Sequence, residues 1–125
     1  MAAKFLFMIA SCYGLVAVGL GAFGAHGLRS RLDDSQMIAW ETAVHYQAVH
    51  AVVLLALGLW LHGLQGRMLS AEWAGWLFAG GVLLFSGSIY LLVLTGARWA
   101  GPVTPLGGLL LVCGWLLLIV TAMRL

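Results

Sequence analysis

The chain has 125 residues, of which 63% are hydrophobic and 8% are charged, and its formal net charge is +2. About a quarter of the residues of a soluble domain are charged, so this composition excludes an ordinary soluble globular protein. The positive charge is small and scattered along the chain, which also argues against a nucleic-acid-binding surface.

Four uncharged apolar segments fill most of the chain. A helix of about 20 apolar residues crosses a hydrocarbon core of roughly 30 Å, and each segment is long enough to do so. The short later connections make neighbouring helices antiparallel. We therefore predict an all-α membrane protein, a single domain over residues 1–125 that forms an antiparallel bundle of four transmembrane helices. The expected spans are residues 5–25, 42–64, 73–95 and 103–123.

The first segment follows Lys4 and is longer than the roughly 7–15 apolar residues of a signal peptide, so we expect an uncleaved helix.

Small residues at spacings of four, three, four and four lie on one face of this helix, which favours close packing against another helix. They are Ala10, Gly14, Ala17, Gly21 and Ala25. At the end of the segment, Gly24 and Gly27 predict a left-handed stop.

The second helix is predicted to begin before it enters the membrane. Asp33 and Gln36 have the spacing of a capping box, which predicts a helix from Asp34 to Leu64. This helix is longer than the span at 42–64. We therefore expect its first two turns to be an interfacial extension, with Trp40 as an anchor at the membrane surface.

The third helix is expected to start near residues 71–73, and a loop at 96–102 leads to the fourth helix. Thr104 is predicted to cap that last helix, and Pro105 is tolerated in its first turn. Glycines in all the segments except the second are expected to allow close helix packing. The candidates are Gly14, Gly21, Gly24, Gly87, Gly107 and Gly108.

Polar residues of the second helix occupy two adjoining faces. Glu41 and His45 are one turn apart and can pair directly, and Tyr46 and His50 are also one turn apart. At a rise of 1.5 Å per residue, His50 lies roughly 10 Å inside the hydrocarbon boundary. Ionisable groups at such depth face the interior of a bundle, because lipid offers them no partner.

The antiparallel topology brings polar residues of the other helices to the same side of the membrane. The second helix enters from this side, the third ends on it, and the fourth starts from it. We therefore predict one polar cluster, which is the candidate ligand-binding site. Its members are His26, Glu41, His45, Tyr46, His50, Ser86, Ser88, Tyr90 and Thr104.

Three roles are open for this cluster: hydrogen bonds that specify helix packing, a binding or ion-handling site, and an active site for covalent chemistry. His45 and His50 point about 140° apart, so they do not form an axial pair for haem. A zinc set of His26, Glu41 and His45 has weak support. Ser86 lacks an acidic partner and an oxyanion loop. We expect no metal, no cofactor and no catalytic residue.

Basic residues do not predict the orientation of the chain in the membrane. The termini and the second loop carry three of them, and the first and third loops carry the other three. The positive-inside rule compares these two sets, so equal numbers favour neither orientation. The first set is Lys4, Arg67 and Arg124, and the second is Arg29, Arg31 and Arg98.

Four segments of the chain resemble, in order, the signatures of a known family. They are GAFGAHGL at 21–28, Trp40 with Tyr46, Gln47 and His50, FSGSIY at 85–90, and TPLGG at 104–108 with Gly114 and Trp115. This pattern is similar to the transmembrane protein 256 family, also called domain of unknown function 423, and it covers essentially the whole chain. The resemblance implies a small four-helix protein of the bacterial inner membrane without an established activity, and it assigns no catalytic roles.

The leading hypothesis is a non-enzymatic membrane protein that acts through lipid or protein contacts. Its partners would be membrane lipids, a second copy of the chain or another membrane protein, and no nucleic acid. The alternative is a small transporter or a protein that binds ions or protons. That protein would use Glu41, His45, Tyr46 and His50 together with Ser86 and Tyr90. A third hypothesis is an oligomeric assembly factor with an exposed face of small residues.

Overall fold

In the computed structural model, which describes residues 1–125, the chain forms four long helices and no strand. All four helices are long and apolar enough to cross a membrane, which confirms the predicted all-α membrane fold. The helices are α1 (Ala2–Phe23), α2 (Asp34–Gly63), α3 (Leu69–Thr95) and α4 (Val103–Met123). A π-helical turn, Gly24–Leu28, follows α1, and a 3-10 turn, Arg98–Ala100, precedes α4.

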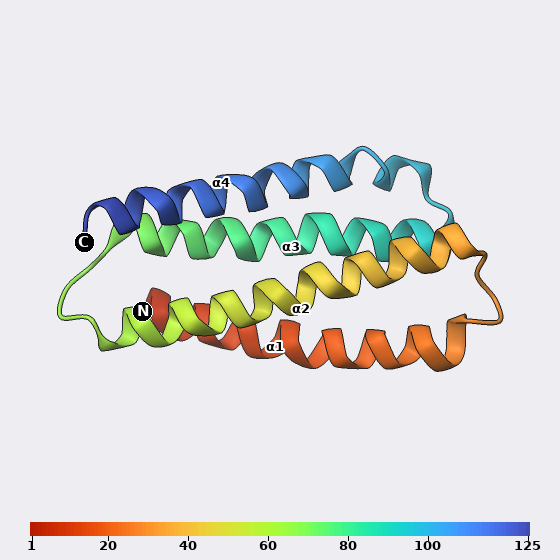
Figure 1. The fold of residues 1–125 in the computed structure, drawn as a ribbon, viewed down its shortest axis with the longest axis horizontal. Coiled ribbons are helices and arrows are strands. Elements are labelled where there is room, and N and C mark those ends of the chain that lie inside the picture. The colour runs from red at the N-terminus through yellow and green to blue at the C-terminus, as the bar shows by residue number, and fades with distance from the viewer.

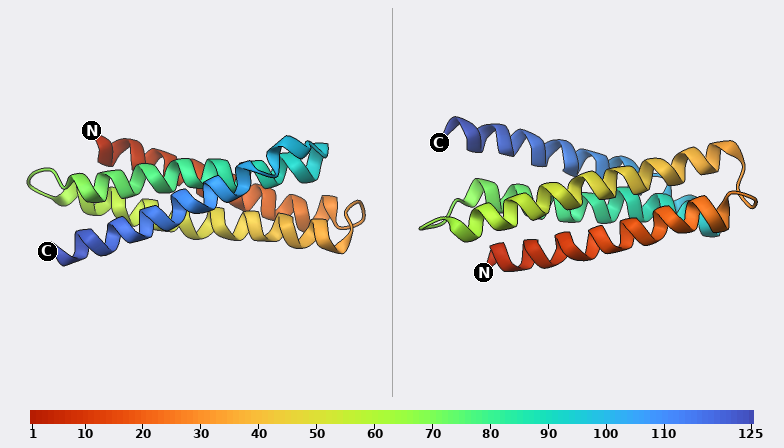
Figure 2. Two further views of the ribbon diagram at one scale, coloured as in Figure 1. Left: turned by 90° about the horizontal axis from the view of Figure 1, so that it is seen from above. Right: turned by 60° about the horizontal axis from the view of Figure 1, so that its bottom comes forward.

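Each helix runs antiparallel to its neighbour in the chain (Figure 1). Both termini and the loop at residues 64–68 lie at one end of the molecule, which we call the terminal end. The loops at 29–33 and 96–102 lie at the other end, which we call the far end. The helix α1 packs on α2, α2 on α3, and α3 on α4, whereas the backbone of α4 approaches neither α1 nor α2 (Figure 2). The bundle is therefore open along one side.

The start of α2 is fixed by its own sequence. The carboxylate of Asp33 accepts a hydrogen bond from the backbone N–H of Gln36 at 2.8 Å, and the Gln36 side chain accepts one from the Asp33 N–H at 3.0 Å. These two bonds satisfy backbone donors that the first turn of a helix leaves free. The predicted capping box and the start at Asp34 are confirmed.

The predicted left-handed stop after α1 was wrong. Gly24 has right-handed helical angles, φ −60° and ψ −46°, and the chain continues through the π-helical turn as far as Leu28. Leu28 is buried, so burial of this side chain holds the extra turn against the bundle. A left-handed glycine does end α3, where Gly96 has φ 69°.

Two other predicted helix starts need correction. The helix α3 begins at Leu69, earlier than predicted, because the backbone N–H of Glu72 already bonds to the carbonyl of Met68 at 3.0 Å. The helix α4 begins at Val103 without any side-chain cap. Thr104 does not cap it, because its hydroxyl is hydrogen-bonded to another helix.

Glycines allow the closest approaches between helices. A Cβ atom on Gly107 would overlap the backbone of Phe85, so α3 and α4 meet there with no side chain between them. A Cβ on Gly24 would lie 2.5 Å from the indole nitrogen of Trp40. Small residues at a membrane helix interface let backbones gain dispersion contacts in this way.

The other predicted packing glycines are less constrained. A Cβ on Gly21 or Gly108 would make an ordinary or slightly tight contact, at 3.4 Å and 3.7 Å. Gly14 and Gly87 have no atom within 4 Å of that position, so the prediction of close packing was wrong for these two. Gly14 instead lines a shallow groove of about 390 Å³ between α1 and α2.

Gly107→Ala should destabilise the bundle by about 1–3 kcal/mol, because the new methyl group must push α4 away from the α3 backbone. The neighbouring Gly108→Ala adds the same methyl group where there is room, so its effect should be neutral or slightly stabilising. Thermal or SDS unfolding of both variants in detergent micelles measures the difference. Equal stability of the two variants would contradict this packing.

The Asp33 cap should respond to pH. Hydrogen bonds from the Gln36 backbone N–H and the Ser35 hydroxyl lower the pKa of Asp33 below its usual value. The cap therefore stabilises α2 at pH values above the unfolded-state pKa, and this contribution is lost as the pH falls through the folded-state pKa. NMR titration should show the Gln36 amide losing its protection from exchange in acid.

Asp33→Asn is the matched control, since asparagine caps a helix equally well without titrating. The amide of Gln36 should show no acid transition in this variant. A transition of the same size in both proteins would assign it to another group.

Candidate functional site

The buried polar side chains all have hydrogen-bond partners within the protein. They come from α2, α3 and α4, and most lie in the half of the bundle nearer the far end. They are Gln47, His50, Ser86, Ser88 and Thr121. Hydrocarbon cannot replace a missing partner, so each of these bonds constrains how the helices pack.

Gln47 connects three helices. Its side-chain oxygen accepts a hydrogen bond from the Tyr90 hydroxyl of α3 at 2.7 Å, and its amide nitrogen donates to the Tyr13 carbonyl of α1 at 2.9 Å. The hydroxyl of Tyr13 in turn donates to the carbonyl of Ala79 in α3 at 2.6 Å. Gln47 is 4% exposed, so the amide has exchanged water for these partners. We call these bonds the Gln47 bridge.

Two further side chains bond to backbone carbonyls across the helix seams. The Ser86 hydroxyl donates to the carbonyl of Ala43 at 2.7 Å, which joins α3 to α2. The indole N–H of Trp40 donates to the Leu20 carbonyl at 2.9 Å, which joins α2 to α1. Trp40 is 1% exposed, so its prediction as an interfacial anchor was wrong. The space over Gly24 admits its indole into the bundle.

His50 joins α2 to α4, although their backbones do not meet. Its Nε2 accepts a hydrogen bond from the Trp115 indole N–H at 3.1 Å, and its Nδ1 lies 2.7 Å from the Tyr46 carbonyl. An indole N–H only donates, so Nε2 carries no proton and Nδ1 must be the donor to the carbonyl. The geometry therefore defines a neutral imidazole in a single tautomer.

Hydroxyl pairs hold α3 to α4 at both ends. Near the far end, Ser88 and Thr104 share a hydrogen bond. Near the terminal end, the hydroxyl of Thr121 donates to Ser70 at 2.8 Å. The sequence-based cluster omitted this second pair, because the terminal halves of the last two helices otherwise read as apolar.

Four residues of the predicted cluster lie outside the bundle interior: His26, Glu41, His45 and Tyr46 are all exposed. Glu41 and His45 make no hydrogen bond with each other, so the direct pair predicted for them was wrong. They occupy the side of α2 opposite to Ala43 and Gln47, as the 3.6-residue period requires once that face is buried. With Arg29 they line a shallow groove near the far end.

Tyr46 packs with its ring rather than through its hydroxyl. The ring centroid lies 4.7 Å from that of Phe85 and 6.2 Å from that of His50. The side chain is 41% exposed and lines a hollow of about 150 Å³ with His45, Val49 and His50.

Besides Ser70 and Thr121, sequence reasoning missed four residues of the interior network: Tyr13, Trp40, Gln47 and Trp115. Gln47 could have been found, because it lies three residues before His50 and therefore on the same helix face. Trp115 appeared only in the family signatures, and Trp40 was predicted as a surface anchor and not as an interior residue. Tyr13 gave no positional signal, since a single tyrosine in an apolar segment fits a lipid-facing position equally well.

Neutral donors and acceptors make up this interior network, and most of its bonds join two different helices. Among the described residues, which are all 125, no group of three metal-ligating side chains occurs. The one ion pair, Arg67 with Glu72 at 2.6 Å, lies at the terminal end outside the network. The interior hydrogen bonds therefore hold the helices together.

Four spanning helices joined by neutral interior bonds define an integral membrane protein. The family described as "Protein of unknown function (DUF423)" matches residues 20–108, and the chain belongs to this family. The protein is 43% identical over 121 residues to UPF0382 membrane protein SH2409 of Staphylococcus haemolyticus, with 97% of each chain covered. It is 39% identical over 121 residues to UPF0382 membrane protein YwdK of Bacillus subtilis, with 97% of this chain and 98% of that protein covered.

No solved structure matches the chain. The family membership confirms the resemblance found in the four signatures. With four spanning helices and bacterial relatives named as membrane proteins, the protein is an integral protein of the bacterial inner membrane.

Tyr90→Phe should destabilise the bundle by about 0.6–1.7 kcal/mol, because it removes the hydroxyl that donates to Gln47. Tyr46→Phe is the matched control, since the Tyr46 hydroxyl makes no hydrogen bond within the protein, and it should leave the unfolding free energy unchanged. SDS titration in micelles measures both. A Tyr46→Phe loss as large as that of Tyr90→Phe would contradict the Gln47 bridge.

Proposed function

We propose that the protein is a non-enzymatic membrane protein that acts through contacts of its outer surface with lipids or with another membrane protein. The observation that carries the proposal is the use of every buried polar side chain in bonds between or within the helices. Side chains whose donors and acceptors are already used in these bonds stabilise the bundle and are not free to take part in a reaction. The surface that remains for function is the outside of the bundle.

That outer surface is apolar on every helix. The helix α4 carries a continuous stripe at spacings of three and four residues, formed by Leu106, Leu109, Val112, Leu116 and Ile119, each more than half exposed. On α1, Leu15 and Val18 are 76% and 74% exposed. Apolar side chains of this size contact acyl chains or the helices of a membrane partner.

The transporter alternative has less support, because its six residues do not all face one space: only His45, Tyr46 and His50 line the same small hollow. His50 uses both ring nitrogens within the protein, and Ser86 and Tyr90 donate to other helices. Glu41 and His45 lie on the opposite side of α2. A path for ions would require these bonds to open.

The test is gentle extraction into lipid nanodiscs, followed by lipid analysis and affinity isolation with quantitative mass spectrometry. We expect lipids, or a defined membrane protein, to be retained above the level found with an unrelated four-helix membrane protein. Absence of both would contradict the proposal. Ion flux in proteoliposomes that Glu41→Gln and His50→Ala both lower would instead favour the transporter.

A further inference from the structure

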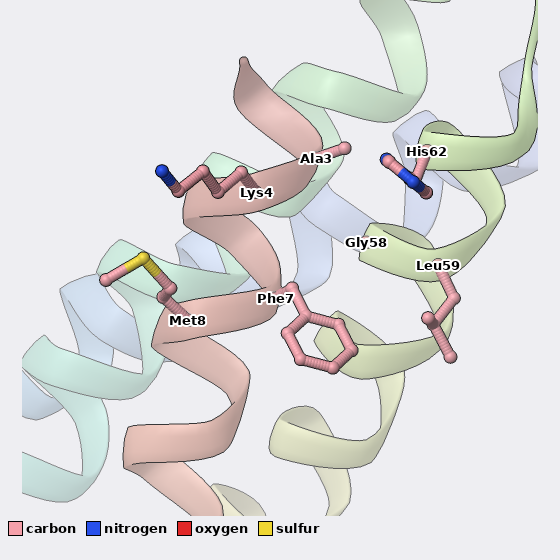
Figure 3. A pocket seen from close by; sticks show the side chains of 7 residues that line it. All are labelled: Ala3, Lys4, Phe7, Met8, Gly58, Leu59 and His62. Atoms are coloured by element: carbon pink, nitrogen blue, oxygen red, sulfur yellow. The ribbon is translucent and has the colours of Figure 1, made fainter.

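A groove between α1 and α2 opens at the terminal end and has a volume of about 380 Å³ (Figure 3). Phe7, Met8 and Leu59 provide most of its apolar lining. Lys4 and His62 line its outer part, nearest to the start of α1 and the end of α2. A volume of this size is within the roughly 300–1,000 Å³ of small-molecule sites.

The floor of the groove is a close crossing of two backbones. A Cβ on Gly58 would lie 3.0 Å from the Phe7 nitrogen and 3.2 Å from the Ala3 oxygen. No side chain of α2 therefore stands between the helices at this point. Phe7 and Leu59, which are 39% and 57% exposed, rise on either side.

The polarity of the groove changes along the axes of α1 and α2. Lys4 lies four residues from Met8, and His62 lies four residues from Gly58, in both cases toward the terminal end. Four residues of a helix span about 6 Å, at a rise of about 1.5 Å per residue. Basic groups thus lie nearer the terminal end of the helices, and apolar groups lie one helical turn deeper. A phospholipid has the same order, with a phosphate above its acyl chains.

Charge is distributed unequally between the two ends. The far end carries three basic and three acidic side chains, whereas the terminal end carries three basic side chains and one acidic, Glu72. The whole formal net charge of +2 therefore belongs to the terminal end. Arg67 already pairs with Glu72, which leaves Lys4 and His62 without an acidic partner.

We propose that this groove binds an anionic phospholipid. The ammonium of Lys4 and a ring N–H of His62 would contact the phosphate, and an acyl chain would lie over Gly58 between Phe7 and Leu59. In Figure 3 the Lys4 side chain extends away from α2, and its rotatable four-carbon stem lets the ammonium turn toward the headgroup. The inference rests on the proposed function, because it names the lipid and the place of one lipid contact.

The test compares Lys4→Gln/His62→Gln with the control Arg98→Gln/His26→Gln. Each double variant removes one exposed cation and one exposed histidine, the first pair at the groove and the second at the far end. The proteins are placed in nanodiscs with equimolar phosphatidylglycerol and phosphatidylcholine, then released and weighed by native mass spectrometry.

The unaltered protein should retain phosphatidylglycerol in preference to phosphatidylcholine. The groove variant should lower this ratio about fivefold, the effect of one cation near an anionic surface, and the control should leave it unchanged. Higher ionic strength should lower the ratio of the unaltered protein toward that of the groove variant.

Two outcomes would overturn the inference in distinguishable ways. Equal ratios in the groove variant and the unaltered protein, with lipid still bound, would mean that lipids contact the protein elsewhere. In that case the proposed function survives and this site does not. Absence of bound lipid from all three proteins would remove the site together with the lipid contacts from which it was inferred.

Discussion

Hydrocarbon offers no hydrogen-bond partner, and this constraint organises the interior of the protein. The amide of Gln47 satisfies it by bonding to α1 and α3 at once, and the imidazole of His50 satisfies it by using both nitrogens. Apolar packing alone gives membrane helices little preference among neighbours, since lipid is as apolar as leucine. These hydrogen bonds give one register of the helices a lower free energy than the alternative registers.

The position of α4 depends on both close packing and hydrogen bonding. The Gly107 backbone lies directly on Phe85, so close packing holds α4 along α3. The backbone of α4 does not approach that of α2, and the indole of Trp115 spans that distance: its N–H donates to His50, and its ring centroid lies 6.0 Å from that of the imidazole. The bundle is consequently open along one side while its interior polar groups are still satisfied.

The inside and the outside of the molecule have separate roles. Interior polar groups are neutral and engaged, whereas the outside is apolar along the helices and positively charged at the terminal end. Such a division agrees with the proposed contacts of the outer surface with lipids or with another membrane protein.

The sequence by itself determined the four spans, their antiparallel order and the capped start of α2, because hydropathy and capping depend only on neighbours along one helix. It also placed His50 and Ser86 inside. Only the tertiary structure decided that Glu41 and His45 face outward, that Trp40 is buried and that Gln47 is the central bridge. Those outcomes depend on how far each helix is rotated about its axis, and contacts between helices set that rotation.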